Sequence, residues 1–351
     1  INGQFSSQAS QIEKLKFSDG SILNLTNMGI AFNQYDTSET INGTVFDDVI
    51  YAGSGHDIIN AGDGDDILVG GKGNDTLKGG YGRDTYIYNL GDGCDTITET
   101  QGRDKIKFGT GIMLSNLTFT QNGNNLIITI NEDKEQRIII NNFYAGNEYK
   151  VESLEFSNGS TFNLSTQGLT LLQTNANETI NGTSYNDTIY GNGGHDTVNA
   201  GEGNDTIIGG IGNDTLNGGN GDDTYVWNLG DGFDTISESG GNDKIVFGEG
   251  INQNDLSFER IGNNLKISVN GNEIQGIQIN NQFSSASYKV ETIEFHDGST
   301  LNISNADQLI QAMNSFGINN SSLMDTLSDP MQDVSDMYSL TANSDLTKKA
   351  I

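Results

Sequence analysis

Aspartate recurs at every ninth residue in two separate stretches of this chain. The first stretch holds Asp48, Asp57, Asp66, Asp75 and Asp84, and the second holds Asp187, Asp196, Asp205, Asp214 and Asp223. Each aspartate closes a glycine-rich frame, which is clearest at residues 70–78 (GGKGNDTLK) and 209–217 (GGIGNDTLN). One carboxylate per nine residues, set in glycine turns, indicates a repeated oxygen-ligand site for a hard cation.

The overall charge excludes two classes of partner. The 351 residues include 47 Asp and Glu against 17 Lys and Arg, a formal charge of −30. Nucleic acid and anionic membranes repel such a surface, so we expect neither as a partner. No apolar run approaches the ~18 residues of a membrane span. The single cysteine, Cys94, allows no internal disulfide, which leaves bound metal as the natural staple for an extracellular chain.

A long repeat contains the short one. The segment 39–44 (ETINGT) recurs at 178–183, and the segment 89–93 (NLGDG) recurs at the same offset, at 228–232. Phe17, Phe156 and Phe295 each begin one of three copies of another motif, again evenly spaced. An internal repeat of this length predicts tandem similar domains. The chain begins at Ile1 with neither Met nor a leader, so we interpret it as a fragment of a larger protein.

These repeats predict an all-β chain with the following organisation. Residues 1–38 are expected to be the tail of a preceding, truncated module. Module 1 covers 39–177, with the nine-residue array at 39–104 and a strand-rich block at 105–177. Module 2 covers 178–308, with its array at 178–243 and its strand-rich block at 244–308. Residues 309–351 lack the glycine repeat and show helical spacing instead, with Asp329 and the only proline, Pro330, placed as a helix start.

The nine-residue frame itself predicts a parallel β-roll. Its first six residues form a tight turn, and the last three form a short strand whose central side chain faces inward. Two units per coil stack turns eighteen residues apart, so that Asp57 lies beside Asp75 and their carboxylates, with backbone carbonyls, form a cage for Ca²⁺. Tyr88 and Trp227 are expected to cover the end of each roll. The turn glycines expected to contribute backbone are Gly53, Gly55, Gly62, Gly64, Gly71, Gly73, Gly80, Gly82, Gly201, Gly203, Gly210, Gly212, Gly219 and Gly221.

The ends of each array are less regular. The spacing increases once from nine to eleven residues, before Asp95 and again before Asp234, and then returns to nine at Asp104 and Asp243. These four aspartates are weaker candidate ligands. The loops that end at Asp48 and Asp187 keep one glycine each. We therefore expect the middle aspartates of each array to bind Ca²⁺ best: Asp57, Asp66 and Asp75, and Asp196, Asp205 and Asp214. His56 and His195 precede ladder aspartates, and we interpret them as exposed loop residues.

The nonapeptides closely resemble the RTX, or haemolysin-type, calcium-binding repeats of proteins exported by type I secretion. The strand-rich halves resemble the haemolysin-type calcium-binding related domain. The resemblance implies a secreted protein, extracellular or at the cell surface of a Gram-negative bacterium, with the type I secretion machinery as partner and an export signal at about 309–351. It also implies that Asp329-Pro330 could be a cleavage site, although a helix cap is the stronger interpretation.

Calcium would then act as a folding switch. Extracellular calcium modules bind at Kd of ~10⁻⁴–10⁻³ M. About eight ions, each contributing about 1.4 kcal/mol at a tenfold excess over Kd, would supply on the order of 11 kcal/mol, comparable to the stability of a whole domain. We expect a non-enzymatic segment of a toxin or adhesin. Two alternatives stay open: a ligand-binding adhesin module whose host or cell-surface ligand is unknown, and the end of a secreted enzyme whose catalytic domain lies upstream.

Overall fold

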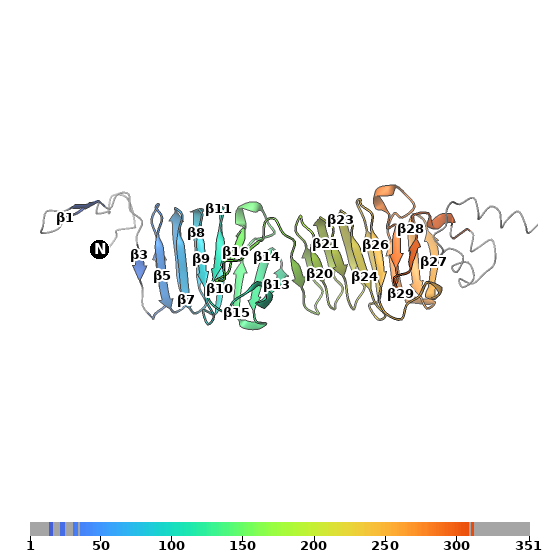
Figure 1. Ribbon diagram of the computed structural model, residues 1–351, viewed down its shortest axis with the longest axis horizontal. Helices are drawn as coiled ribbons and strands as arrows, with labels where there is room; N and C mark the ends of the chain where they lie inside the picture. Colours follow the sequence, from blue (N-terminus) through green and yellow to red (C-terminus); the bar gives the residue numbers. More distant parts are fainter. Residues whose placement is uncertain (1–13, 17–21, 25–30, 34–35, 309, 312–351) are drawn as a thin grey trace, which may run out of the picture.

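The protein is an elongated stack of short β-strands (Figure 1). The structure is a computed structural model, which describes residues 14–16, 22–24, 31–33, 36–308 and 310–311. Its elements are almost all strands, so the predicted all-β class and parallel β-roll are confirmed. The helical tail predicted for 309–351, including Asp329-Pro330, lies outside the described residues except for 310–311, which are helical together with 306–308.

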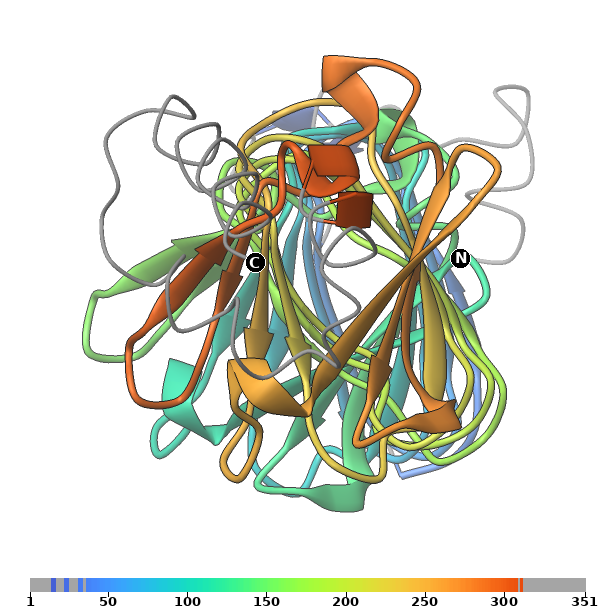
Figure 2. The same cartoon turned by 90° about the vertical axis from the view of Figure 1, so that its right-hand side faces the viewer.

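The first roll consists of two parallel sheets that face each other across a thin core (Figure 2). The chain alternates between the sheets, because each nine-residue unit supplies one strand and the turn that leads to the opposite sheet. One sheet contains β3 (Ala31–Asn33), β5 (Val49–Ser54), β7 (Ile67–Lys72), β9 (Thr85–Tyr88) and β12 (Lys105–Phe108). The other contains β4 (Thr40–Asn42), β6 (Ile58–Asp63), β8 (Thr76–Gly82) and β10 (Cys94–Thr98), with the short β11 (Gln101–Gly102) beside β8.

The second roll repeats this arrangement at the spacing of the long sequence repeat. One of its sheets contains β18 (Thr170–Leu172), β20 (Thr188–Tyr190), β22 (Thr206–Ile208), β24 (Thr224–Trp227) and β26 (Lys244–Phe247). The other contains β19 (Thr179–Asn181), β21 (Thr197–Glu202), β23 (Thr215–Asn220) and β25 (Phe233–Ser237). Neighbouring strands pair in register eighteen residues apart, for example Thr197 with Thr215, as the nine-residue period requires.

The strand-rich blocks continue the rolls without a break. In the first block these strands are β13 (Leu117–Asn122), β14 (Asn125–Ile130), β15 (Asp133–Ile140), β16 (Ser153–Glu155) and β17 (Thr161–Asn163). In the second they are β27 (Leu256–Ile261), β28 (Asn264–Val269), β29 (Asn272–Ile279), β30 (Thr292–Glu294) and β31 (Thr300–Asn302). Strand β15 extends one sheet by pairing in parallel with β10, and β16 extends the other by pairing with β12. Both sheets therefore continue across the boundary that was expected after residue 104.

Antiparallel hairpins follow the parallel strands in each block. Strands β13, β14 and β15 form an antiparallel meander, and β16 and β17 form a hairpin. The hairpin of β1 (Lys14–Lys16) and β2 (Ile22–Asn24) lies one long repeat before β16 and β17, as the sequence period predicts. Within the described ranges, single turns of 3-10 helix complete the blocks: η2 (Leu114–Asn116), η3 (Asn147–Tyr149), η4 (Gln253–Asp255) and η5 (Ala286–Tyr288).

The core is a thin layer of apolar side chains contributed by both sheets. All of the central strand residues expected to face inward are buried: Ile50, Ile59, Leu68, Leu77, Tyr86, Ile189, Val198, Ile207, Leu216 and Tyr225. Tyr88 and Trp227 do not cover an end, however. The ring of Tyr88 packs edge-on against Phe108 of the next coil at 6.3 Å, and Phe108 stacks on Phe156 at 5.4 Å. Trp227 makes the equivalent contact with Phe247 at 5.7 Å, so the aromatic core extends into the strand-rich block.

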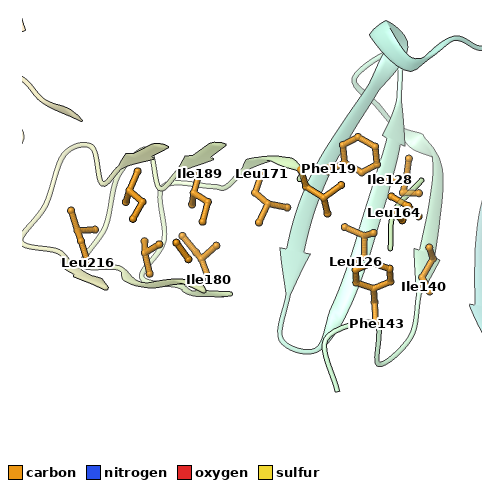
Figure 3. Packing of buried hydrophobic residues seen from close by; sticks show 14 of the residues in the cluster. Phe119, Leu126, Ile128, Ile140, Phe143, Leu164, Leu171, Ile180, Ile189 and Leu216 are labelled. Atoms are coloured by element: carbon orange, nitrogen blue, oxygen red, sulfur yellow. The ribbon is translucent and has the colours of Figure 1, made fainter. Parts of the chain in front are cut away.

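The two modules join through one sheet. Strand β13 of the first block pairs in parallel with β18 of the second roll, with Phe119 opposite Leu171. Figure 3 shows these two side chains in one file, which leads from Leu126 and Ile128 on one side to Ile189 on the other. A sheet that begins in the first roll therefore continues into the second.

Candidate metal centres

The ladder aspartates form two columns along each roll, one at each edge. Asp48, Asp66 and Asp84 precede strands β5, β7 and β9 of one sheet. Asp57 and Asp75 precede β6 and β8 of the opposite sheet. Turns eighteen residues apart therefore lie on the same edge, as the sequence predicts. The second roll follows the same rule, with Asp187, Asp205 and Asp223 on one edge and Asp196 and Asp214 on the other.

From Asp57 in the first roll and Asp187 in the second, one oxygen of each aspartate links its turn to the preceding turn in the column. The Oδ1 of Asp75 accepts the backbone N–H of Asp57 at 2.8 Å, and the Oδ1 of Asp84 accepts that of Asp66 at 2.8 Å. In the second roll the Oδ1 of Asp214 accepts the N–H of Asp196 at 2.8 Å. Because the acceptor is ionisable, each such bond is stronger than a neutral one. These bonds set the carboxylates one above the other in a fixed orientation.

The second carboxylate oxygen is buried and has no hydrogen-bond partner among the described residues. This holds for Oδ2 of Asp57, Asp66, Asp75, Asp84, Asp104, Asp196, Asp205, Asp214, Asp223 and Asp243. A buried oxygen of an ionised group that lacks a partner costs free energy, at least ~1–3 kcal/mol for the desolvated group. A row of such ionised oxygens is therefore unfavourable unless the carboxyls are protonated or a cation binds to them.

Burial raises the pKa of these carboxyls. The pKa of Asp66 and of Asp205 is raised to about 7, chiefly because burial disfavours the charged form, with a further contribution from neighbouring ladder carboxylates. The pKa of Asp75 is raised to about 6 by burial, although the N–H of Asp57 opposes the shift. Such shifts mark where negative charge accumulates away from water. A bound divalent cation would oppose both effects, because an adjacent positive charge stabilises the ionised carboxylates.

The turn glycines allow neighbouring turns in a column to approach closely. Gly71 has φ +92°, and a Cβ there would lie closer than 3.0 Å to the carbonyl oxygen of Gly53 in the turn below. A Cβ at Gly73 would similarly meet the carbonyl oxygen of Gly55. Any larger residue would separate the turns whose carboxylates face each other. The other glycines expected to line the turns also have positive φ, except Gly212: Gly53, Gly55, Gly62, Gly64, Gly80, Gly82, Gly201, Gly203, Gly210, Gly219 and Gly221.

The irregular positions of the arrays rejoin the columns. The two extra residues before Asp95 lie in a turn in which the N–H of Asn89 donates to Asp92 at 2.7 Å. Beyond it, the Oδ1 of Asp95 accepts the N–H of Asp75 at 3.0 Å, twenty residues away instead of eighteen. Asp104, and in the second roll Asp234 and Asp243, hold equivalent places. The structure thus brings all four weaker candidates into the ladder.

The first rungs differ from the middle ones. The Oδ2 of Asp48 accepts the N–H of Thr44 at 2.6 Å, and the Oδ2 of Asp187 accepts the N–H of Thr183 at 2.5 Å. The threonine that follows the single glycine of each loop thus supplies the hydrogen bond that the middle rungs lack. These two oxygens are therefore less destabilised in the absence of a cation than the unpaired Oδ2 atoms of the middle aspartates of each array.

Several acidic residues in the columns were not among the candidates. The N–H of Asp104 donates to Oε2 of Glu152 at 2.6 Å, and the N–H of Asp243 donates to Oε2 of Glu291 at 2.8 Å. A glutamate of the strand-rich block therefore acts as the last rung on that edge. Glu99 and Glu238 are also buried beside ladder aspartates. The signal that could have revealed all four is their recurrence in both copies of the long repeat, at fixed offsets from the ladder.

The histidines lie outside the carboxylate columns. His56 is exposed, and its Nδ1 accepts the backbone N–H of Asn74 at 2.9 Å. His195 does the same for Asn213 at 2.8 Å. Both side chains thus lie in exposed loops, as expected, and stabilise the stacking of turns.

The donor set fits Ca²⁺. Each cage offers carboxylate oxygens with backbone from the glycine turns, and hard oxygen ligands without thiolate or imidazole suit Ca²⁺ rather than Zn²⁺. None of the helical segments in the described ranges has the length and hydropathy needed to cross a bilayer. A stacked β-roll with a column of carboxylates on each edge defines a class of proteins whose turns supply oxygen ligands for hard cations.

Comparison with known families identifies this class. The RTX calcium-binding nonapeptide repeat matches four times, at residues 35–68, 60–93, 173–207 and 200–226. The haemolysin-type calcium binding protein related domain matches at residues 125–166 and 264–305. The chain therefore contains RTX calcium-binding repeats, each array being followed by one copy of the related domain.

Comparisons with individual proteins add little to this. No curated protein sequence matches the chain. Among solved structures, the extracellular lipase LipA from Serratia marcescens is 16% identical, with a TM-score of 0.23. The match covers 76% of this chain and 40% of the lipase chain.

Proposed function

We propose that the chain is a non-enzymatic, calcium-folded region of a longer protein that is exported by type I secretion and folds outside the cell. Calcium ions would bind between turns eighteen residues apart and hold each roll closed. The whole protein would be a toxin or adhesin of a Gram-negative bacterium, with this region supporting its export.

The observation that carries the proposal is the row of buried Oδ2 atoms without a partner. The β-roll cannot be closed without bringing these carboxylates together, because the fixed spacing of one aspartate per coil edge places them there. Mutual repulsion and desolvation then oppose folding until a cation binds. Folding and calcium binding are thus one equilibrium.

The magnitude suits a switch between compartments. About eight ions, each adding about 1.4 kcal/mol at a tenfold excess over Kd, contribute on the order of 11 kcal/mol. A typical domain has only ~5–15 kcal/mol of net stability, so removal of calcium would unfold the rolls. Calcium far below a Kd of ~10⁻⁴–10⁻³ M, as inside a cell, would leave the chain unfolded and fit for threading through the type I secretion machinery.

Far-ultraviolet circular dichroism tests the folding step. The chain is measured in EGTA, then after addition of millimolar Ca²⁺, with Mg²⁺ at the same concentration as the control. We expect a β signal to appear with Ca²⁺ and not with Mg²⁺, which demands a smaller octahedral site. An unchanged β signal on adding Ca²⁺ would refute calcium-driven folding.

Secretion needs its own test. The chain is fused to a reporter and expressed with a type I exporter in a Gram-negative host, and the culture medium is assayed for the reporter. We expect export that depends on the exporter and stops when the cytoplasm is loaded with Ca²⁺, because premature folding would block threading. Export that is indifferent to the exporter would contradict the proposed route.

A further inference from the structure

The last turn of each array begins with a glutamate, whereas the turns that close at Asp48 to Asp84 and at Asp187 to Asp223 begin with glycine or alanine. In the nine-residue frame, the first position of each turn is glycine or alanine from Gly43 to Gly79. In the turn that closes at Asp104, this position is Glu99, and in the turn that closes at Asp243 it is Glu238. Both glutamates lie beyond the residues matched by the nonapeptide repeat, which end at 93 and 226.

Glu99 points into the ladder. A Cβ built on Gly79, the equivalent position in the preceding turn of the same column, would meet Oδ2 of Asp84 closer than 3.0 Å, so this position faces the carboxylate column. One oxygen from each of Asp84, Glu99 and Asp104 lies within 4.8 Å of the others. All three side chains are buried, with exposures of 1%, 0% and 1%.

A tyrosine fixes the orientation of the glutamate. The phenol of Tyr86 donates a hydrogen bond to Oε1 of Glu99 and accepts the backbone N–H of Gly79 at 2.8 Å. The other glutamate oxygen, Oε2, is buried and has no partner among the described residues. The same holds for Oδ2 of Asp84 and Oδ2 of Asp104. Three carboxylates therefore each present an unsatisfied buried oxygen to one small space.

The second module repeats the cluster, although Oε2 of Glu238, unlike that of Glu99, accepts the backbone N–H of Ser239 at 3.3 Å. Asp223, Glu238 and Asp243 are buried, with one oxygen of each within 4.8 Å of the others. The phenol of Tyr225 donates to Oε1 of Glu238. A Cβ at Gly218 would meet Oδ2 of Asp223, the Tyr225 phenol and Oε1 of Glu238, all closer than 3.0 Å. The cluster of two aspartates and one glutamate therefore occurs at the end of both arrays.

We propose that each array ends in a distinct calcium site, formed by Asp84, Glu99 and Asp104 in module 1 and by Asp223, Glu238 and Asp243 in module 2, which fills before the sites between the nonapeptide turns. The proposal rests on the calcium-binding function above and extends it. Three carboxylates attract a cation more strongly than the two of a standard cage, and affinity of calcium sites rises with ligand charge and rigidity. The Tyr86 and Tyr225 phenols supply rigidity.

The position of the site gives it a role in folding order. It joins the last turn of the roll to the coil before it, next to the strand-rich block that continues both sheets. An ion bound there first would fix this coil, and neighbouring turns would then add to a formed edge. In a stacked repeat each unit contacts only its neighbours, so folding can spread from one formed coil.

Calcium counting on the full chain tests the site. Equilibrium dialysis and calorimetry with Ca²⁺ are run on the wild type, on Glu99→Gln, on Glu238→Gln and on the double variant. We expect each single change to remove one ion of the tightest class, and the double change to remove two. The loss of affinity at each changed site should be at least the ~10-fold to 100-fold that removal of a group supporting a metal ligand costs.

Matched controls separate a ligand from a structural acid. Glutamine keeps the size of Glu99 and can still pair with Tyr86, so dichroism in saturating Ca²⁺ should show the wild-type fold. Tyr86→Phe removes the hydrogen bond and keeps all three carboxylates. If Tyr86→Phe and Glu99→Gln reduce Ca²⁺ affinity equally and neither changes the number of bound ions, Glu99 supports the fold without binding calcium, and the proposal is overturned.

A terbium experiment keeps the test decisive should glutamine prevent folding. Tb³⁺ is added below one equivalent per chain, and its luminescence is excited through tyrosine. We expect the first ions to be sensitised by Tyr86 and Tyr225, so that Tyr86→Phe combined with Tyr225→Phe lowers the early signal several-fold. An unchanged early signal overturns the proposal. A wild-type chain that binds no calcium refutes the proposed function itself, whereas normal binding without a tight class refutes only this site.

Discussion

Two glycines with nearly the same positive φ separate the cost of that φ for alanine from the cost of pushing two turns apart. Gly71 has φ +92° and a Cβ there would meet the carbonyl oxygen of Gly53 closer than 3.0 Å. Gly91 has φ +94°, and a Cβ there would find nothing within 4 Å. We therefore predict that Gly71→Ala is much more destabilising than Gly91→Ala.

The magnitude follows from these two positions. Left-handed backbone costs alanine about 1–2 kcal/mol, and Gly91→Ala should cost only this. Gly71→Ala adds an overlap with backbone, which a flexible side chain cannot relieve, at about 1–3 kcal/mol. It also separates the turns that end at Asp57 and Asp75, and loss of one ion there costs about 1.4 kcal/mol at a tenfold excess of Ca²⁺ over Kd. The difference between the variants should be about 2–4 kcal/mol.

Urea unfolding in millimolar Ca²⁺, followed by circular dichroism, measures both free energies, and calcium titration counts the ions. Gly210→Ala and Gly230→Ala form an equivalent pair in the second roll, since only Gly210 lies against a neighbouring turn. Equal destabilisation within each pair, with equal ion counts, would refute the inference that close stacking of turns forms the cage.

Three further predictions concern charge. Asp75→Asn keeps an acceptor for the N–H of Asp57 but removes charge from the cage. The Ca²⁺ concentration at the midpoint of a titration should therefore rise by about tenfold. Asp63→Asn, at an exposed position, is the control and should leave this midpoint unchanged. Because the pKa of Asp66 is raised from 3.8 to about 7, its contribution to the metal-free fold is fully present below about 3.8 and is lost as pH rises through about 7. Dichroism in EGTA should therefore show more β structure at pH 5 than at pH 8, and calcium titration should show weaker binding at pH 5. Arg83→Ala removes an exposed ion pair with Asp65 and should change the unfolding free energy by less than about 1 kcal/mol in urea.

The sequence predicted the rolls well because their period is strict. Every coil has the same length, so the side chain that faces inward, such as Ile50 or Val198, follows from counting. The column partners follow from the same count, as the bond between Asp57 and Asp75 shows. The strand-rich blocks at 105–177 and 244–308 were also predicted, and β14, β15 and β28 lie within them.

The parts that were missed depend on contacts between distant segments. Glu152 completes a column through a bond to Asp104, 48 residues away, and no local pattern marks it. Tyr88 was expected at an end because the nonapeptides stop there, but β12 and β16 extend the sheet and enclose it. Glu99 does not follow from the aspartate period, because it lies at the position where the frame normally has glycine or alanine.

The pair of strands that joins the modules has a consequence for how such a chain can vary. Strand β18 meets β13 through one short parallel contact, and β3 holds the place equivalent to β18 at the start of the first roll. Each module therefore presents the same kind of strand to whatever precedes it. Duplication or deletion of one complete module would lengthen or shorten the rod by a fixed increment and leave its cross-section, its core and its ion-binding edges unchanged.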